Sequence, residues 1–136
     1  MHLYFLSIVV NMLISFILMA DDFGEKLSFL KKIADFFKGL GTKFIVACSA
    51  LLISLLKLIF PAGTDQIPFI GDFFPMVAGF SLGAILLLDA VKAKSEIENK
   101  SLQKIEKVVL KNKGLVGFIC LIIAVLHFIF AEIPIL

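Results

Sequence analysis

Long runs of apolar residues alternate along the chain with shorter lysine-rich segments. A helix needs ~17–25 apolar residues to cross ~30 Å of hydrocarbon. Inside lipid a spanning segment is helical, because every backbone polar group must find its partner within the segment. The pattern therefore predicts four transmembrane helices, over residues 3–20, 44–60, 73–91 and 114–131. The first run lacks a basic leader, so we interpret it as a retained span rather than a secretory signal.

The segments between these pairs of spans are amphipathic. Residues 23–40 carry an apolar stripe at helical spacing opposite charged positions, and Asp22 with Glu25 forms a capping-box start. This pattern predicts a helix lying on the membrane surface. Its membrane-surface residues are expected to be Phe23, Leu27, Leu30, Phe37, Lys31 and Lys32. Residues 95–112 show a similar but weaker pattern that ends at Asn112–Gly114, and a solvated connector is the alternative there.

Composition strengthens the membrane assignment. The chain has 136 residues, of which 60% are hydrophobic and 18% are charged, and its mean hydropathy is +1.06. A soluble protein of this size could not bury so much apolar surface. The net charge of +2 and the lack of a basic patch with interleaved aromatics give no indication of nucleic-acid binding. Richness in Phe, Ile and Lys without Arg or Trp is typical of an AT-rich bacterial genome, which suggests a bacterial inner membrane.

Lysines set the expected orientation. Five lie in residues 21–43 and seven in residues 92–113, whereas the loop 61–72 has none. Cytoplasmic loops carry the excess of lysine and arginine in membrane proteins. We therefore expect both lysine-rich segments on the cytoplasmic side, and the N-terminus and C-terminus outside.

The two halves of the chain follow one plan. Residues 1–68 and 69–136 each contain a span, an amphipathic lysine-rich segment, a second span and an Ile-Pro exit. Residues of the first span recur 68 positions later, as Asp21 does at Asp89, and residues of the second span recur 70 positions later. The expected fold class is an all-α integral membrane protein: a four-transmembrane-helix bundle made of two parallel hairpin repeats, each with a cytoplasmic amphipathic helix.

Small residues form stripes on three of the spans and predict helix contacts. In lipid, helices associate through close packing, which small side chains permit. The helix-packing residues are expected to be Ala47, Ala50, Ser54, Gly79, Gly83, Gly117, Cys120 and Ala124. Both cysteines lie inside apolar runs, which favours a packing role over a disulfide framework.

Two ionisable residues interrupt the apolar spans at matching repeat positions, Lys57 and His127. Ionisable residues inside a membrane are functional candidates by default. A polar site facing outward could be formed by Lys57, His127, Asp72 and Glu132. The alternative is structural: Lys57 extends its amine to the outer interface, and His127 bonds a backbone carbonyl. If the two cations approach, either His127 is neutral or a carboxylate lies between them.

The sequence gives no indication of catalysis or of metal or cofactor binding. The sequence has no catalytic motif, no metal-ligand spacing and no cofactor motif, so we expect neither an enzyme nor a bound metal or cofactor. Our leading hypothesis is a small non-enzymatic membrane protein that acts as a structural or accessory subunit of a homo-oligomer or larger membrane complex. Its partners would be the lipid bilayer and itself or other membrane subunits. The alternative is a transporter or channel for a small solute or ion that uses Lys57 and His127.

Overall fold

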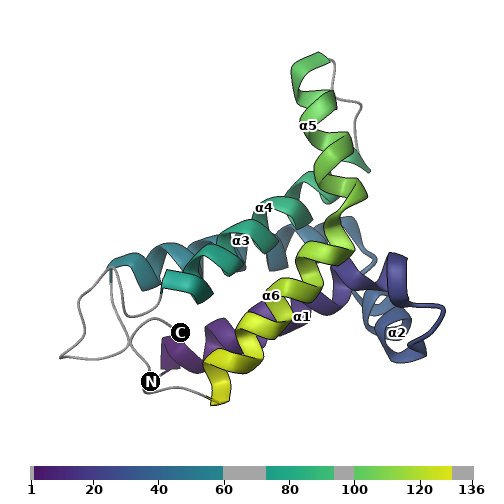
Figure 1. The fold of residues 1–136 in the computed structure, drawn as a ribbon. Helices are drawn as coiled ribbons and strands as arrows, with labels where there is room; N and C mark the ends of the chain where they lie inside the picture. Colours follow the sequence, from purple (N-terminus) through teal and green to yellow (C-terminus); the bar gives the residue numbers. More distant parts are fainter. Residues whose placement is uncertain (1, 60–72, 94–99, 130–136) are drawn as a thin grey trace.

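The computed structural model describes residues 2–59, 73–93 and 100–129. Within these ranges the protein is all-helical and has no strand, which confirms the all-α prediction. Six helices follow one another, and Figure 1 labels them. They are α1 (His2–Phe23), α2 (Ser28–Phe36), α3 (Leu40–Ile59), α4 (Phe73–Lys92), α5 (Lys100–Lys111) and α6 (Lys113–Ile129).

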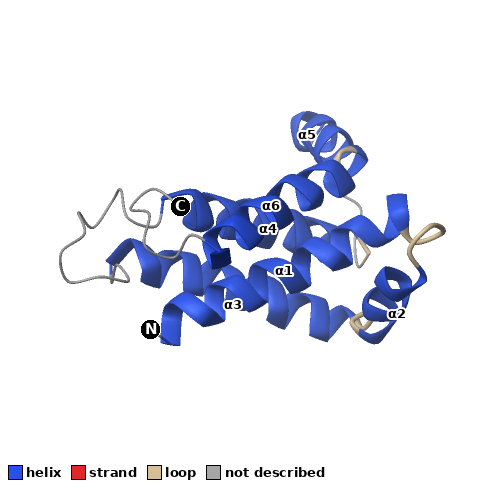
Figure 2. Ribbon diagram, turned by 60° about the horizontal axis from the view of Figure 1, so that its bottom comes forward, coloured by secondary structure: helices blue, strands red, loops and turns tan. Residues whose placement is uncertain are grey.

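The four long helices lie side by side, as Figures 1 and 2 show. α1 packs along α6, and α3 packs along α4, with smaller contacts between these two pairs. Each pair is antiparallel, so α1 begins where α6 ends. The shorter helices α2 and α5 both lie at the opposite end of the bundle, where α1 and α4 end (Figure 1).

Three helices, α1, α3 and α4, are long and apolar enough to cross a membrane, and α5 with α6 would form a fourth candidate. The α5–α6 pair is bent by 58° at Asn112. The amide of Asn112 donates to the carbonyl of Val108 (2.9 Å), so the side chain satisfies a carbonyl near the end of α5. The sequence predicted that the amphipathic segment would end at Asn112–Gly114. α5 ends at Lys111, next to that position, and α6 begins directly at Lys113.

The predicted surface helix over 23–40 is also corrected by the structure. α1 continues to Phe23, so Asp22 lies inside α1 and is not the cap of the next helix. The chain leaves the helix at Gly24, whose amide bonds the Ala20 carbonyl (2.9 Å), and a Cβ there would overlap that carbonyl. A separate α2 starts at Ser28 without a side-chain cap, and α3 already starts at Leu40.

α2 packs on the bundle instead of standing apart from it. Leu30 is completely buried, and Ile33 and Phe37 pack against the core. Leu30 therefore does not face the membrane surface as the sequence analysis expected. The exposed aromatics of this segment are Phe29 and Phe36, and Phe36 is 78% exposed. Phe29 also meets Phe16 of α1 in an edge-to-face ring contact, with centroids 5.7 Å apart.

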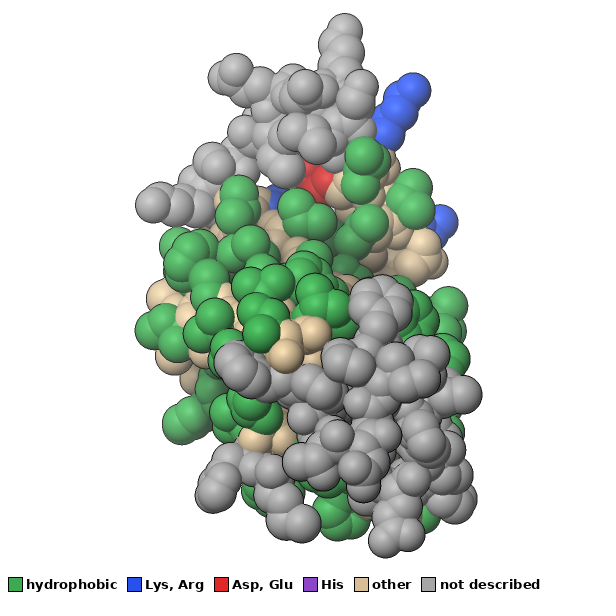
Figure 3. Space-filling model, turned by 90° about the vertical axis from the view of Figure 1, so that its left-hand side faces the viewer, with side chains coloured by type: hydrophobic (Ala, Val, Ile, Leu, Met, Phe, Trp, Pro, Cys, Tyr) green, Lys and Arg blue, Asp and Glu red, His purple; other side chains and the backbone are tan. Residues whose placement is uncertain are grey.

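The core of the bundle combines large aliphatic side chains with small residues. Ile14, Leu18, Leu82 and Leu86 are each at most 1% exposed, and alanines pack among them. All eight residues expected at helix contacts are buried: Ala47, Ala50, Ser54, Gly79, Gly83, Gly117, Cys120 and Ala124. Large Leu, Ile, Val and Phe side chains are instead exposed on the outer faces of the long helices. Figure 3 shows hydrophobic side chains over most of the coloured surface of one face, with charged ones toward the top.

Glycine permits the closest helix contacts. A Cβ at Gly83 would lie 3.1 Å from the Ala47 carbonyl oxygen, and a Cβ at Gly117 would lie 3.0 Å from the Ser15 carbonyl oxygen. Backbone atoms cannot move aside as a flexible side chain can. The α4 backbone therefore approaches α3, and the α6 backbone approaches α1, only because these positions lack a side chain.

We expect Gly83→Ala and Gly117→Ala each to lower the free energy of unfolding by about 1–3 kcal/mol through overpacking. Gly41→Ala is the matched control, because a Cβ at Gly41 meets nothing within 4 Å. That change should be neutral or stabilising, since alanine is favoured over glycine in a helix by about 1 kcal/mol. Unfolding of the purified variants measures the effect, and equal losses for all three would contradict the close-approach argument.

Candidate functional site

Lys57 and His127 meet inside the bundle, at the end where α1 begins. Each side chain is only 2% exposed. The Lys57 amine lies 3.2 Å from Nε2 of His127. A hydrogen bond between two nitrogens needs one of them to accept, and the tautomer of His127 sets which nitrogen donates.

Tyr4 of α1 completes this group, and we call Tyr4, Lys57 and His127 the Lys57–His127 cluster. The Tyr4 hydroxyl donates to the backbone carbonyl of His127. The Tyr4 ring lies 4.6 Å from the His127 ring, and the Lys57 amine lies 5.6 Å from the Tyr4 centroid, within reach of a cation–π interaction. The cluster therefore places an amine, an imidazole and a phenol in contact with one another. Asp72 and Glu132, the other members of the expected polar site, lie outside the described residues.

A second polar group lies about a turn further into the bundle. The Asn11 amide donates to the Pro75 carbonyl (3.1 Å), linking α1 to α4. The proline is tolerated in the first turn of α4, where a backbone N–H would have no helical partner. A Cβ at Gly79 would lie 3.0 Å from the Asn11 carbonyl oxygen and would overlap the Ser54 hydroxyl. The polar atoms of α1 and α3 therefore fit against the bare backbone of α4.

Four charged residues join the long helices at the other end, and sequence reasoning missed them as a group. We call Asp21, Lys43, Asp89 and Lys113 the ion cluster, since each comes from a different long helix. Asp89 accepts from Lys43 (2.7 Å) and from Lys113 (2.9 Å), and Lys113 also pairs with Asp21. The signal was present in the sequence: Asp89 follows Asp21 by 68 positions, and Lys113 follows Lys43 by 70.

Burial differs within the ion cluster. The side chains of Asp89 and Lys113 are 17% and 15% exposed, whereas that of Asp21 is 66% exposed. The paired carboxylate and amines offset the cost of holding each charge away from water. Asp89 is thus the central member, because it contacts two lysines from two helices while largely shielded.

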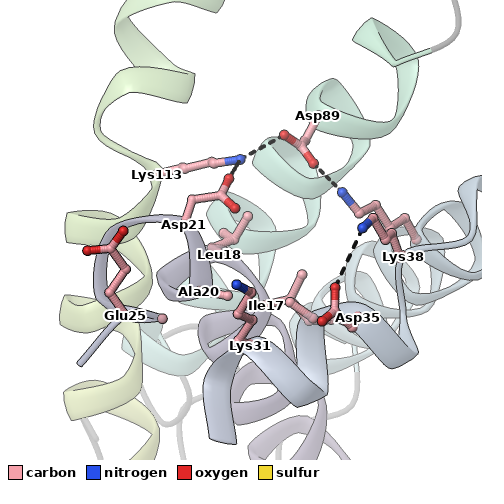
Figure 4. A pocket seen from close by; sticks show the side chains of 13 residues that line it. Ile17, Leu18, Ala20, Asp21, Glu25, Lys31, Asp35, Lys38, Asp89 and Lys113 are labelled. Atoms are coloured by element: carbon pink, nitrogen blue, oxygen red, sulfur yellow. Dashed lines mark hydrogen bonds and ion pairs between the residues drawn. The ribbon is translucent and has the colours of Figure 1, made fainter. Parts of the chain in front are cut away.

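A pocket of about 380 Å³ adjoins the ion cluster, between the end of α1 and α2. Figure 4 shows Lys113 placed between Asp21 and Asp89, with Glu25 and Lys31 lining the same space. Acidic and basic side chains are balanced in this lining, and Lys38 pairs with Asp35 (3.6 Å) at its edge. The pocket is polar and mixed in charge, so it does not select for an anion or a cation.

Similarity to known proteins is limited to one family. A family model matches residues 1–127, which cover almost the whole chain and include both charged clusters. The chain belongs to this family, whose function is unknown. No curated protein and no solved structure matches the chain.

We expect Asp89→Asn to destabilise the protein more than Asp21→Asn. Hydrogen bonds to charged groups contribute about 1.5–3 kcal/mol, and the first change weakens two of them in a shielded place. Exposed ion pairs contribute about 0–1 kcal/mol, so the second change should cost little. Chemical unfolding of the two variants beside the wild type decides this, and a larger loss for Asp21→Asn would contradict the central role of Asp89.

Proposed function

We propose that this protein is an integral membrane protein that spans the bilayer four times, with α1, α3, α4 and α6 as the spans. The support is the outer surface of these helices, where large apolar side chains such as Phe44, Leu52, Phe80 and Phe118 are exposed. In water these side chains would form an apolar surface far larger than a soluble monomer shows. In lipid the same surface has no cost, because acyl chains are equally apolar.

The proposed orientation follows from where the charged helices lie. α2, α5 and the ion cluster are all at one end of the bundle, and the lysine-rich segments 21–43 and 92–113 meet there. That end is cytoplasmic under the positive-inside rule. The first turn of α1 and the last turn of α6 then lie at the outer side, together with the Lys57–His127 cluster.

Two parallel repeats account for the pairing of the helices. A shift of 68 residues takes α1 to α4, and a shift of 70 takes α3 to α6. Gly83 is the counterpart of Ser15, and Ala47 is the counterpart of Gly117. The close contact between Gly117 and Ser15 in one helix pair therefore recurs between Ala47 and Gly83 in the other. The same shifts also convert the pair Lys113–Asp21 into the pair Lys43–Asp89. Matching backbone approaches and matching ion pairs support a pseudo-twofold axis along the membrane normal.

For the role of this bundle, we propose a non-enzymatic structural or accessory subunit in a membrane complex. The observation that carries this proposal is the packing of the interior, where Gly79, Gly83 and Gly117 each bring a neighbouring helix to about 3 Å from the position of a Cβ. Helices fixed in this way, with ion pairs at one end, form a rigid element. The small-residue stripes are used inside the monomer, so contacts with itself or other subunits would involve the Leu/Ile/Phe faces or the lysine-rich end.

A second candidate is a transporter or channel for a small solute or ion, with its outward-facing site at Lys57 and His127. The observation that favours it is the burial of a lysine amine against an imidazole at the outer end of an apolar bundle. Buried ionisable groups in spans commonly belong to ion or proton pathways. A protonated lysine there could move its proton to His127 when a solute binds nearby.

Labelling with a membrane-impermeant thiol reagent tests the topology. In a Cys48→Ala/Cys120→Ala background, a cysteine replacing Lys31 or Lys104 should react only after the membrane is opened, because both positions are cytoplasmic in this proposal. A cysteine replacing His2 should react in intact cells and serves as the positive control. Labelling of Lys31→Cys from the outside would contradict the orientation.

Native mass and flux separate the two roles. A structural subunit should purify from its own membrane as an oligomer or with partner subunits, and liposomes containing it should show no solute or proton flux. For a transporter, flux should be present and should be lost in Lys57→Met, while Lys26→Met, which changes an exposed lysine, should leave it intact. A stable monomer without partners would contradict the structural role.

A further inference from the structure

The two repeats differ in how the helix before the second span packs. In the first half, α2 lies against α1, with the ring of Phe29 on that of Phe16. In the second half, α5 contacts α4 and α6 much less and projects from the bundle, as Figure 1 shows. Among the described residues, α5 therefore only borders the position on α4 that corresponds to the seat of α2 on α1.

A groove of about 430 Å³ lies at that position. Its α4 lining is Ser81, Ala84, Ile85 and Leu88, which are the 68-residue counterparts of Leu13, Phe16, Ile17 and Ala20. Its other sides are lined by Val108 and Val109 of α5, by Asn112 at the bend and by Val116 of α6. In the first half, Phe16 packs against Phe29 of α2. Its counterpart in the second half is Ala84, which is exposed.

The sequence explains why α5 leaves this groove open. Gly39 lies between α2 and α3, Gly41 lies in the first turn of α3, and the helix is interrupted from Phe37 to Gly39. Their counterparts 70 residues later are Val109 and Lys111, which continue α5 as a helix. Because α5 runs on to Lys111, it meets α6 with a 58° bend and cannot fold back along α4 as α2 does along α1.

We propose that this groove binds an anionic phospholipid, with one acyl chain along α4 between Ser81 and Leu88. The inference rests on the proposed membrane insertion, which places the groove in the cytoplasmic leaflet one to two turns from the ion cluster. In that leaflet the groove faces lipid, and the residues that line the groove are almost entirely apolar. Its volume falls within the ~300–1,000 Å³ of ligand pockets.

The lysines of α5 favour a phospholipid with an anionic headgroup. Lys104, Lys107 and Lys111 recur along one side of the helix, next to the face that carries the exposed Ile105 and Val108. Glu106 pairs with Lys92 (2.6 Å), which ties α5 to the end of α4. α5 therefore borders the groove with Val108 and Val109, and its lysines follow the neighbouring side of the same helix. Basic sites between spans on the cytoplasmic side are known to favour anionic lipids.

The test compares binding of phosphatidylglycerol and phosphatidylcholine to the purified, detergent-solubilised full chain by native mass spectrometry. The wild type should retain phosphatidylglycerol. Ala84→Phe restores the aromatic residue found at the equivalent Phe16 and fills the groove, so affinity for phosphatidylglycerol should fall about tenfold or more through the loss of buried methylene contacts. Val77→Phe, on an exposed part of α4 outside the groove, is the matched control and should bind as the wild type does.

A second pair of variants keeps the test decisive if Ala84→Phe fails to fold. Lys104→Gln/Lys111→Gln should lower phosphatidylglycerol affinity by about fivefold per lysine and reduce its preference over phosphatidylcholine. Lys26→Gln/Lys32→Gln, which removes two exposed lysines elsewhere, should leave the preference unchanged. Equal lipid retention in the wild type, the lysine variants and any folded groove variant would overturn the proposal, and so would a stoichiometric protein partner in the groove that excludes lipid.

Flotation with membranes after carbonate treatment distinguishes the two levels of failure. A protein released by carbonate would contradict the proposed membrane insertion itself. A protein that stays with the membrane but binds phosphatidylglycerol no better than its Ala84→Phe variant would contradict only the lipid site.

Discussion

The rest of the structure depends on the close approach of helix backbones at Gly83 and Gly117. At these positions a carbonyl of the neighbouring helix lies 3.0–3.1 Å from the place of the missing Cβ. Two consequences follow for each antiparallel pair. Large residues such as Leu18 and Leu86 can fill the centre, and the ends of the helices come near enough for charged side chains to meet across all four.

The ion cluster and the Lys57–His127 cluster use their charged side chains in different ways. At the lysine-rich end, Asp89 and its two lysines satisfy one another across helices, which is a structural use of charge. At the other end, Lys57 contacts an imidazole and the face of an aromatic ring. The bundle thus has ion pairs that join the helices at one end and a buried contact between an amine and an imidazole at the other.

The sequence could predict the helices and their buried stripes because hydrophobic run length and small-residue spacing are local signals. It could also bring Lys57 and His127 to equivalent positions, since the 70-residue shift relates them directly. It could not predict where α1 ends, because Asp21 and Asp22 interrupt the apolar run although the helix continues through them. Nor could it predict that Leu30 packs inward, because an amphipathic stripe fits a protein surface and a membrane surface equally well.

The differences between the repeats carry more information about function than their similarity does. Equivalent contacts at the glycines and ion pairs explain why the bundle is stable, and they leave no feature to distinguish the two halves. Gly39 lies between α2 and α3 and Gly41 in the first turn of α3, whereas their counterparts Val109 and Lys111 keep α5 continuous up to its bend. This difference in backbone preference lets α2 pack on α1, while α5 only borders the matching groove on α4. The groove beside α5 is therefore the feature that distinguishes one half of the bundle from the other.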